Sequence, residues 1–118
     1  MTPRSQLMQE AHALDEAGRY REARDAFLVA ADAAEEEGKR TIAWALRLVA
    51  RKMHIADWAR KKFPTLGIRS SHVFPRPPTL DVRQAMNEEV KVFLIRSPFF
   101  DEALVVSVDR RGRVRRVT

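Results

Sequence analysis

The chain contains no cysteine, which excludes disulfides, thiolate metal sites and a cysteine nucleophile together. Only four glycines are present, and none stands in a Gly-x-Gly-x-x-Gly or Gly-Lys-Ser/Thr context, which excludes the common phosphate-binding loops. No apolar run approaches the ~18 residues of a transmembrane helix, and the N-terminus lacks the apolar stretch of a secretory signal. We therefore expect a cytoplasmic protein without a membrane partner.

Acidic residues are almost missing from the middle third of the chain. Residues 39–78 hold ten lysines and arginines against Asp57 alone (+9), whereas residues 1–38 hold four arginines against nine carboxylates (−5). Residues 79–118 add +2, and the formal charge of the chain is +6 at pH 7. Basic charge gathered on one part of a fold attracts nucleic acid, anionic lipid or an acidic protein. Arginine outnumbers lysine 17 to 5, so a coding bias towards arginine explains the charge equally well.

Apolar residues recur at helical spacing through the first half of the chain. The pattern predicts three helices, over residues 3–17, 20–37 and 41–62, with Gly18 and Gly38 ending the first two. The second helix has one apolar side, formed by Tyr20, Ala23, Phe27, Ala30, Ala31 and Ala34.

The turn between the first two helices resembles a known repeat. It follows the Gly-x-Tyr-x-x-Ala-x-x-x-Tyr/Phe-x-x-Ala pattern of the tetratricopeptide repeat (TPR), carried here by Gly18, Tyr20, Ala23, Phe27 and Ala30. The match covers residues 4–37, about a third of the chain. With the third helix it also looks like the MIT domain, a TPR-like three-helix bundle that binds short helical peptides. The resemblance therefore implies a helical interaction module.

The second half of the chain has a different composition. Prolines concentrate in residues 64–78, which predict a loop packed against the body of the protein, and a short helix with Asp81 and Gln84 at capping-box spacing follows. We expect three successive parts: a TPR-like three-helix unit (1–63), the proline-rich loop, and the short helix with a small sheet (79–118).

The last thirty residues change to the pattern of β-strands. Residues 90–95 and 103–108 are β-branched and aromatic runs, and residues 109–112 form a hairpin turn that leads into residues 113–117. We therefore expect three antiparallel strands and an α+β fold.

No group of residues has the spacing of a catalytic or metal site. His12, His54 and His72 each lack a His, Asp or Glu partner at metal-ligand spacing. The carboxylate pairs Glu88-Glu89 and Asp101-Glu102 are adjacent in sequence, and neighbouring side chains in a helix or turn point apart. We expect no enzymatic activity, no metal and no cofactor.

The third predicted helix has two contrasting sides. One holds an apolar stripe within about 90°, which we expect to be buried; its members are Ile42, Leu46, Val49, Met53 and Ala56. The other is a basic–aromatic stripe, formed by Arg40, Trp44, Arg47, Arg51, His54, Trp58 and Lys61. Such a stripe suits phosphate contact with base stacking, and equally an acidic protein groove. Alternatively, the loop or the sheet covers both tryptophans.

Arginines also crowd the C-terminal hairpin, at positions Arg110, Arg111, Arg113, Arg115 and Arg116. Arginine can bind phosphates, so these residues are candidate phosphate contacts. The alternative is that charges on an edge strand prevent sheet-to-sheet aggregation.

Three functions remain open. The leading hypothesis is a non-enzymatic protein-interaction module, an adaptor or inhibitor, that binds a protein partner through the basic–aromatic stripe. The alternative is a nucleic-acid-binding protein that uses the helix over residues 41–62 together with the arginine hairpin. A third is a structural homo-oligomer, for which the adjacent Phe99 and Phe100 are a candidate contact.

Overall fold

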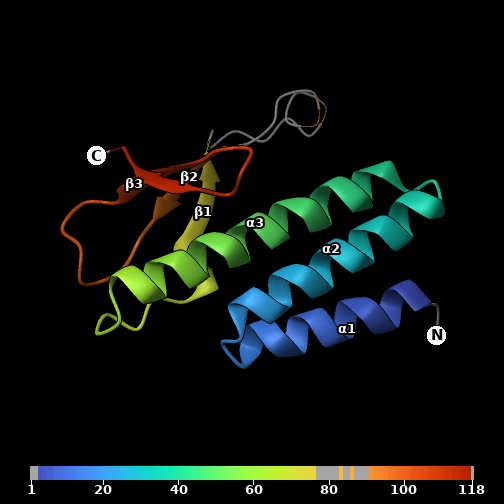
Figure 1. Cartoon of the computed structure of the whole chain (residues 1–118), viewed down its shortest axis with the longest axis horizontal. Helices are drawn as coiled ribbons and strands as arrows, with labels where there is room; N and C mark the ends of the chain where they lie inside the picture. Colours follow the sequence, from blue (N-terminus) through green and yellow to red (C-terminus); the bar gives the residue numbers. More distant parts are fainter. Residues whose placement is uncertain (1–2, 77–82, 84–85, 87–90, 118) are drawn as a thin grey trace. The chain divides into compact units, whose positions relative to one another are not determined.

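The computed structural model describes residues 3–76, 83, 86 and 91–117, and these form three helices followed by a four-stranded antiparallel sheet (Figure 1). The helices are α1 (Pro3–Glu16), α2 (Tyr20–Glu36) and α3 (Arg40–Lys62). After a 3₁₀ turn, η1 (Ser70–His72), come β1 (Val73–Arg76), β2 (Val92–Ile95), β3 (Leu104–Val108) and β4 (Val114–Arg116). The expected α+β class is confirmed. The chain divides into two compact units, Met1–His54 and Ile55–Thr118.

The first two helices end in the same backbone motif. Gly18 has φ of +74° and donates its N–H to the Asp15 carbonyl at 2.9 Å, while the N–H of Arg19 reaches the Leu14 carbonyl at 2.9 Å. The same pair of hydrogen bonds recurs around Gly38 at the end of α2. These bonds satisfy carbonyls that the helix leaves without partners, and the positive φ favours glycine. Both helix ends predicted from the glycines are confirmed.

Small residues form the contact side of the helical hairpin in the first unit. All six residues predicted for the apolar side of α2 are buried, and Ala11 of α1 is buried as well. Alanine lets two helices approach closely, and Phe27 fills the space beside it. The rings of His12 and Phe27 form a T-shaped pair, with centroids 5.1 Å apart. Figure 1 shows α1 and α2 side by side.

The buried face of α3 differs from the predicted one. Leu46, Met53 and Ala56 are buried as expected, but Ile42 and Val49 are only half-buried. Besides Leu46, Met53 and Ala56, the helix buries Ala43, Ala50, Ile55 and Ala59. The prediction placed the largest aliphatic side chains inward, whereas the helix also buries Ala43, Ala50 and Ala59, and small residues permit close packing. No helix in the described part of the chain is long and apolar enough to cross a membrane.

The sheet has four strands, and the prediction of three was wrong. The additional strand, β1, lies inside the segment 64–78 that its prolines indicated as loop, and it pairs antiparallel with β2 so that Pro75 faces Phe93. β1 is at the edge of the sheet, where a proline without an N–H is tolerated. The three other strands fall where expected. The predicted short helix, with Asp81 and Gln84, lies outside the described residues.

One face of the sheet belongs to the core of the second unit. Its buried side chains are Val73, Phe93, Ile95, Leu104, Val106 and Val108. Ile55, Ala56 and Ala59 of α3 and Ile68 of the following segment are buried in the same unit. Arg60 donates from Nε to the carbonyl of Ile68 at 2.9 Å, which holds this segment to the helix. Within the proline-rich segment, Ile68 and Val73 are fully buried, whereas Phe74 is 43% exposed.

Replacing Phe27 with alanine should lower the free energy of unfolding by about 3–5 kcal/mol, because the mutation leaves a cavity in a fully buried contact. Leu28→Ala is the matched control: Leu28 is the next residue of α2 and is 41% exposed, so its loss should be below about 1 kcal/mol. Urea unfolding followed by circular dichroism measures both. Equal losses in the two variants would contradict the assigned packing of the hairpin.

Candidate binding surfaces

The basic–aromatic stripe of α3 is only partly accessible. Arg40, Arg47 and Lys61 are exposed, whereas the others, Trp44, Arg51, His54 and Trp58, are half-buried. The stripe is also shared between the two compact units, since Trp58 and Lys61 belong to the second. The sequence left open whether the two tryptophans are exposed or covered, and in the structure both are half-buried.

Arg47 is held by two carboxylates of α2. Its Nη1 lies 2.5 Å from Oε2 of Glu35, and its Nη2 lies 3.5 Å from Oδ1 of Asp32. The hydrogen bond to Glu35 raises the pKa of Arg47, and partial desolvation opposes that shift. Exposed pairs of this kind add little stability, typically below about 1 kcal/mol. They do neutralise the charge of Arg47 within its own unit.

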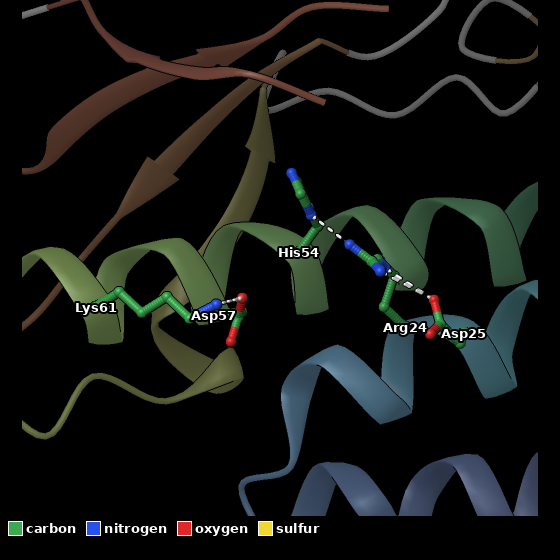
Figure 2. A network of polar contacts seen from close by, with 5 residues as sticks. All are labelled: Arg24, Asp25, His54, Asp57 and Lys61. Atoms are coloured by element: carbon green, nitrogen blue, oxygen red, sulfur yellow. Dashed lines mark hydrogen bonds and ion pairs between the residues drawn. The ribbon is translucent and has the colours of Figure 1, made fainter. Parts of the chain in front are cut away.

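His54 and Lys61 are also engaged inside the chain (Figure 2). Nη1 of Arg24, on α2, lies 3.0 Å from Nδ1 of His54, and the guanidinium also pairs with Asp25. A guanidinium can only donate hydrogen bonds, so Nδ1 accepts and His54 carries its proton on Nε2. Lys61 pairs with Asp57, one helical turn away, at 2.9 Å. The stripe therefore offers few uncompensated charges.

Trp58 takes part in a chain of aromatic contacts within the second unit. Its ring meets Phe63 edge to face at a centroid distance of 6.3 Å, and Phe63 meets Phe100 at 5.4 Å. Edge-to-face pairs of this kind stabilise packed cores. Of the two adjacent phenylalanines, Phe100 is thus half-buried against the end of α3, and Phe99 is 65% exposed.

The C-terminal hairpin presents all five of its arginines, Arg110, Arg111, Arg113, Arg115 and Arg116, at exposed positions. Asp109 organises the turn: its Oδ1 accepts the backbone N–H of Arg111 at 2.8 Å and that of Arg113 at 2.9 Å. These bonds, led by the one from Arg113, lower the pKa of Asp109, and the nearby positive charges of Arg113 and Arg115 act in the same direction. The hairpin is therefore a defined turn carrying solvent-accessible arginines.

The outward face of the sheet carries a second apolar surface, which the sequence analysis missed. Phe74 of β1 pairs with Leu94 of β2, and Leu94 pairs with Val105 of β3. Val117, which follows β4, donates its N–H to the Val105 carbonyl at 2.8 Å and so extends the same row. We call these four residues the apolar row. Phe74 is 43% exposed and Val117 is 59% exposed, while Leu94 and Val105 are half-buried. The row thus crosses the whole sheet and is open to solvent at both ends.

Arginines border the apolar row on both sides. Arg96, which follows β2, holds its guanidinium 5.6 Å from the centre of the Phe74 ring. On the other side of the row, Arg76 of the edge strand β1 pairs with Val92. In the same line across the sheet, Val92 pairs with Ser107, and Ser107 pairs with Arg115 of the other edge strand, β4. None of these three arginines forms an ion pair with any residue that the structure describes.

The outward strand positions together form what we call the open face: Phe74, Arg76, Val92, Leu94, Val105, Ser107 and Arg115. None of them is acidic. The signal for this face was present in residues 92–95, an uninterrupted apolar run. A strand buried on one side only should alternate apolar and polar residues, so such a run indicates apolar character on both faces.

Among the residues described, no group of three or more His, Asp or Glu side chains is placed to hold a metal ion. Comparison with known proteins found no family model, no curated protein and no solved structure that matches the chain. The function of the chain must therefore be inferred from its surfaces.

The hydrogen bonds to Asp109 should make the hairpin sensitive to acid. A carboxyl whose pKa is lower in the folded state stabilises the fold above its unfolded pKa of about 3.9, and this contribution is lost as the pH falls through the folded pKa. Titration of the Asp109 carboxyl carbon by NMR should therefore give a midpoint below about 3.9. A midpoint at or above that value would contradict the described turn.

The corresponding variant is Asp109→Asn, which should lose less stability than the wild type between about pH 5 and pH 2. Asp101→Asn removes an exposed carboxylate from the segment between β2 and β3, and it controls for the loss of one negative charge. Urea unfolding across this pH range measures both.

Proposed function

We propose that the chain is a non-enzymatic protein-interaction module and that its contact surface is the open face of the C-terminal sheet. The observation that carries this proposal is the apolar row, exposed at Phe74 and Val117 and bordered by arginines. Interfaces typically combine an apolar centre with a polar rim, and arginine and aromatic residues are enriched among the side chains that dominate binding energy.

The open face is a better candidate than the basic–aromatic stripe, through which the sequence predicted binding. Arg47 already meets Glu35 and Asp32, and Lys61 already meets Asp57. A partner that used these side chains would have to displace carboxylates of the same chain. The arginines around the apolar row form no ion pair with the described residues. Asp109 lies near Arg115, but its Oδ1 accepts the backbone N–H groups of Arg111 and Arg113.

We propose that the helices of the first unit act as a TPR-like scaffold. Two observations support this. Four residues of the repeat-like pattern, Tyr20, Ala23, Phe27 and Ala30, are buried, and the fifth, Gly18, has the positive φ of the turn. In this proposal the pattern serves packing of the hairpin, and binding is assigned to the sheet.

A nucleic-acid partner is the second candidate, and the arginines favour it. Five exposed arginines on the hairpin, together with Arg76 and Arg96, can contact phosphates. Single-stranded nucleic acid, however, binds sheet surfaces by stacking its bases on several aromatic rings. The open face has one ring, Phe74, and the guanidinium of Arg96 already lies over it.

Affinity capture from a lysate of the source cell, with and without nuclease, tests this proposal. We expect a discrete protein that remains bound after nuclease treatment to the wild type and is lost from Arg76→Glu/Arg115→Glu. The matched control is Arg21→Glu/Arg40→Glu, which makes the same charge change at exposed positions of α2 and α3 and should retain the protein.

Two results would count against the proposal. Capture that disappears with nuclease would favour the nucleic-acid candidate. Capture of a protein that both double variants retain, or that both lose, would place the contact surface outside the open face.

A further inference from the structure

We infer that the segment bound by the open face is an acidic amphipathic helix that lies across the strands. Its apolar side chains contact the apolar row, and its carboxylates, on both borders of its apolar stripe, pair with Arg96 on one side and with Arg76 and Arg115 on the other. This inference rests on the proposed function and names the chemistry of its partner.

The dimensions of the apolar row fit a short stretch of helix. From Phe74 to Val117 the row crosses four strands, which is three steps of about 4.8 Å, or about 14 Å. A helix rises about 1.5 Å per residue, so side chains at positions i, i+4 and i+7 span about 10 Å. Two turns of helix laid along the row therefore bring three apolar side chains onto it.

The arginines lie where the borders of such a helix would fall. Arg96 is two residues beyond Leu94 along β2, and Arg76 is two residues beyond Phe74 along β1, in the opposite direction across the sheet. Two residues of strand cover about 7 Å, so the arginines on either side lie about that far from the row. This distance is close to the radius of a helix with its side chains. Guanidinium groups form paired hydrogen bonds with carboxylates, and the open face has no acidic residue that would repel them.

Other occupants fit the open face less well. An extended strand would pair with an edge of the sheet, but β1 contains Pro75, which lacks an N–H, and β4 has only three residues. A second copy placed face to face would bring arginine against arginine, which repel. Three of the four residues of the apolar row are aliphatic, which suits leucine-like side chains better than stacked bases.

Binding of synthetic probes to the full chain tests the inference. The probes are fluorescein-labelled helical peptides of about 18 residues with Leu, Met or Phe in the apolar stripe and Glu on both borders. The control peptides carry Lys in place of Glu, and a labelled oligothymidylate of about 15 nucleotides represents single-stranded nucleic acid. Fluorescence anisotropy at about 50 and 300 mM salt measures affinity and its screening.

Two pairs of variants locate the contact. Arg115→Glu should weaken the acidic peptide roughly tenfold, because it replaces an attraction with a repulsion, while Arg21→Glu on α2 should leave the affinity unchanged. Val117→Ser should weaken it about fivefold through lost apolar contact. Val29→Ser is its control, because Val29 of α2 is 53% exposed, close to the 59% of Val117.

The expected result is that the Glu peptides bind, more weakly at higher salt, and that the Lys peptides and the oligonucleotide bind at least about tenfold more weakly. Failure of every Glu peptide to bind, equal binding of the Lys peptides, tighter binding of the oligonucleotide, or equal effects of Arg115→Glu and Arg21→Glu would overturn the inference. So would a dimer of the chain alone, seen on size-exclusion chromatography, that Arg115→Glu dissociates.

The two proposals fail separately. If the Glu peptides do not bind but a protein captured from lysate is lost from the open-face variant and retained by its control, the partner is not an acidic helix and the proposed function stands. If the open-face variant binds the lysate protein as well as the wild type does, the proposed function fails, and the inference that rests on it fails too.

Discussion

The backbone hydrogen bonds that pair β1 with β2 and β2 with β3 decide which side chains share a face of the sheet. Because side chains alternate along a strand, this register places Val73, Ile95 and Leu104 together in the core and Phe74 and Leu94 together outside. A shift of one residue in the β1–β2 pairing, for example, would bring Phe74 to the core side and Val73 to the outward side. Both the core of the second unit and the apolar row therefore depend on the same register.

Within the first unit, opposite charges meet across the helices. The acidic residues of α2 include Glu35 and Asp32, and both contact Arg47 of α3. Arg24 of α2 pairs with the adjacent Asp25 and also contacts His54 of α3. Lys39 and Arg47 of the basic middle third thus pair with carboxylates of the acidic first third. Around the sheet, Arg76, Arg96 and Arg115 form no ion pair with any of the described residues.

Local chemistry made the helical part of the fold predictable. Gly18 and Gly38 mark helix ends because the left-handed backbone conformation that closes a helix favours glycine, and the apolar side of α2 follows from its spacing. The face of α3 was misjudged because side-chain size alone does not show that Ala43 and Ala50 are buried while Ile42 and Val49 are only half-buried.

The strand β1 was missed for a related reason, since the effect of a proline depends on tertiary context. Pro75 breaks a central strand but is compatible with an edge strand, and the sequence of the segment does not show which it is. The open face could not be assembled without β1, because the first residue of the apolar row, Phe74, belongs to it. The basic residues of α3 were found, but the carboxylates that bind Arg47 belong to α2. Pairing between distant segments is not visible in spacing.

The arginine border of the apolar row has a consequence for the chain in the absence of a partner. Copies with the same positive face repel one another, and this repulsion limits their association through the exposed Phe74 and Val117. Dissolved salt shortens the range of that repulsion but leaves the attraction between apolar surfaces intact. The groups proposed to select a partner therefore also act as a colloidal barrier, whose height is set by the ionic strength of the surrounding solution.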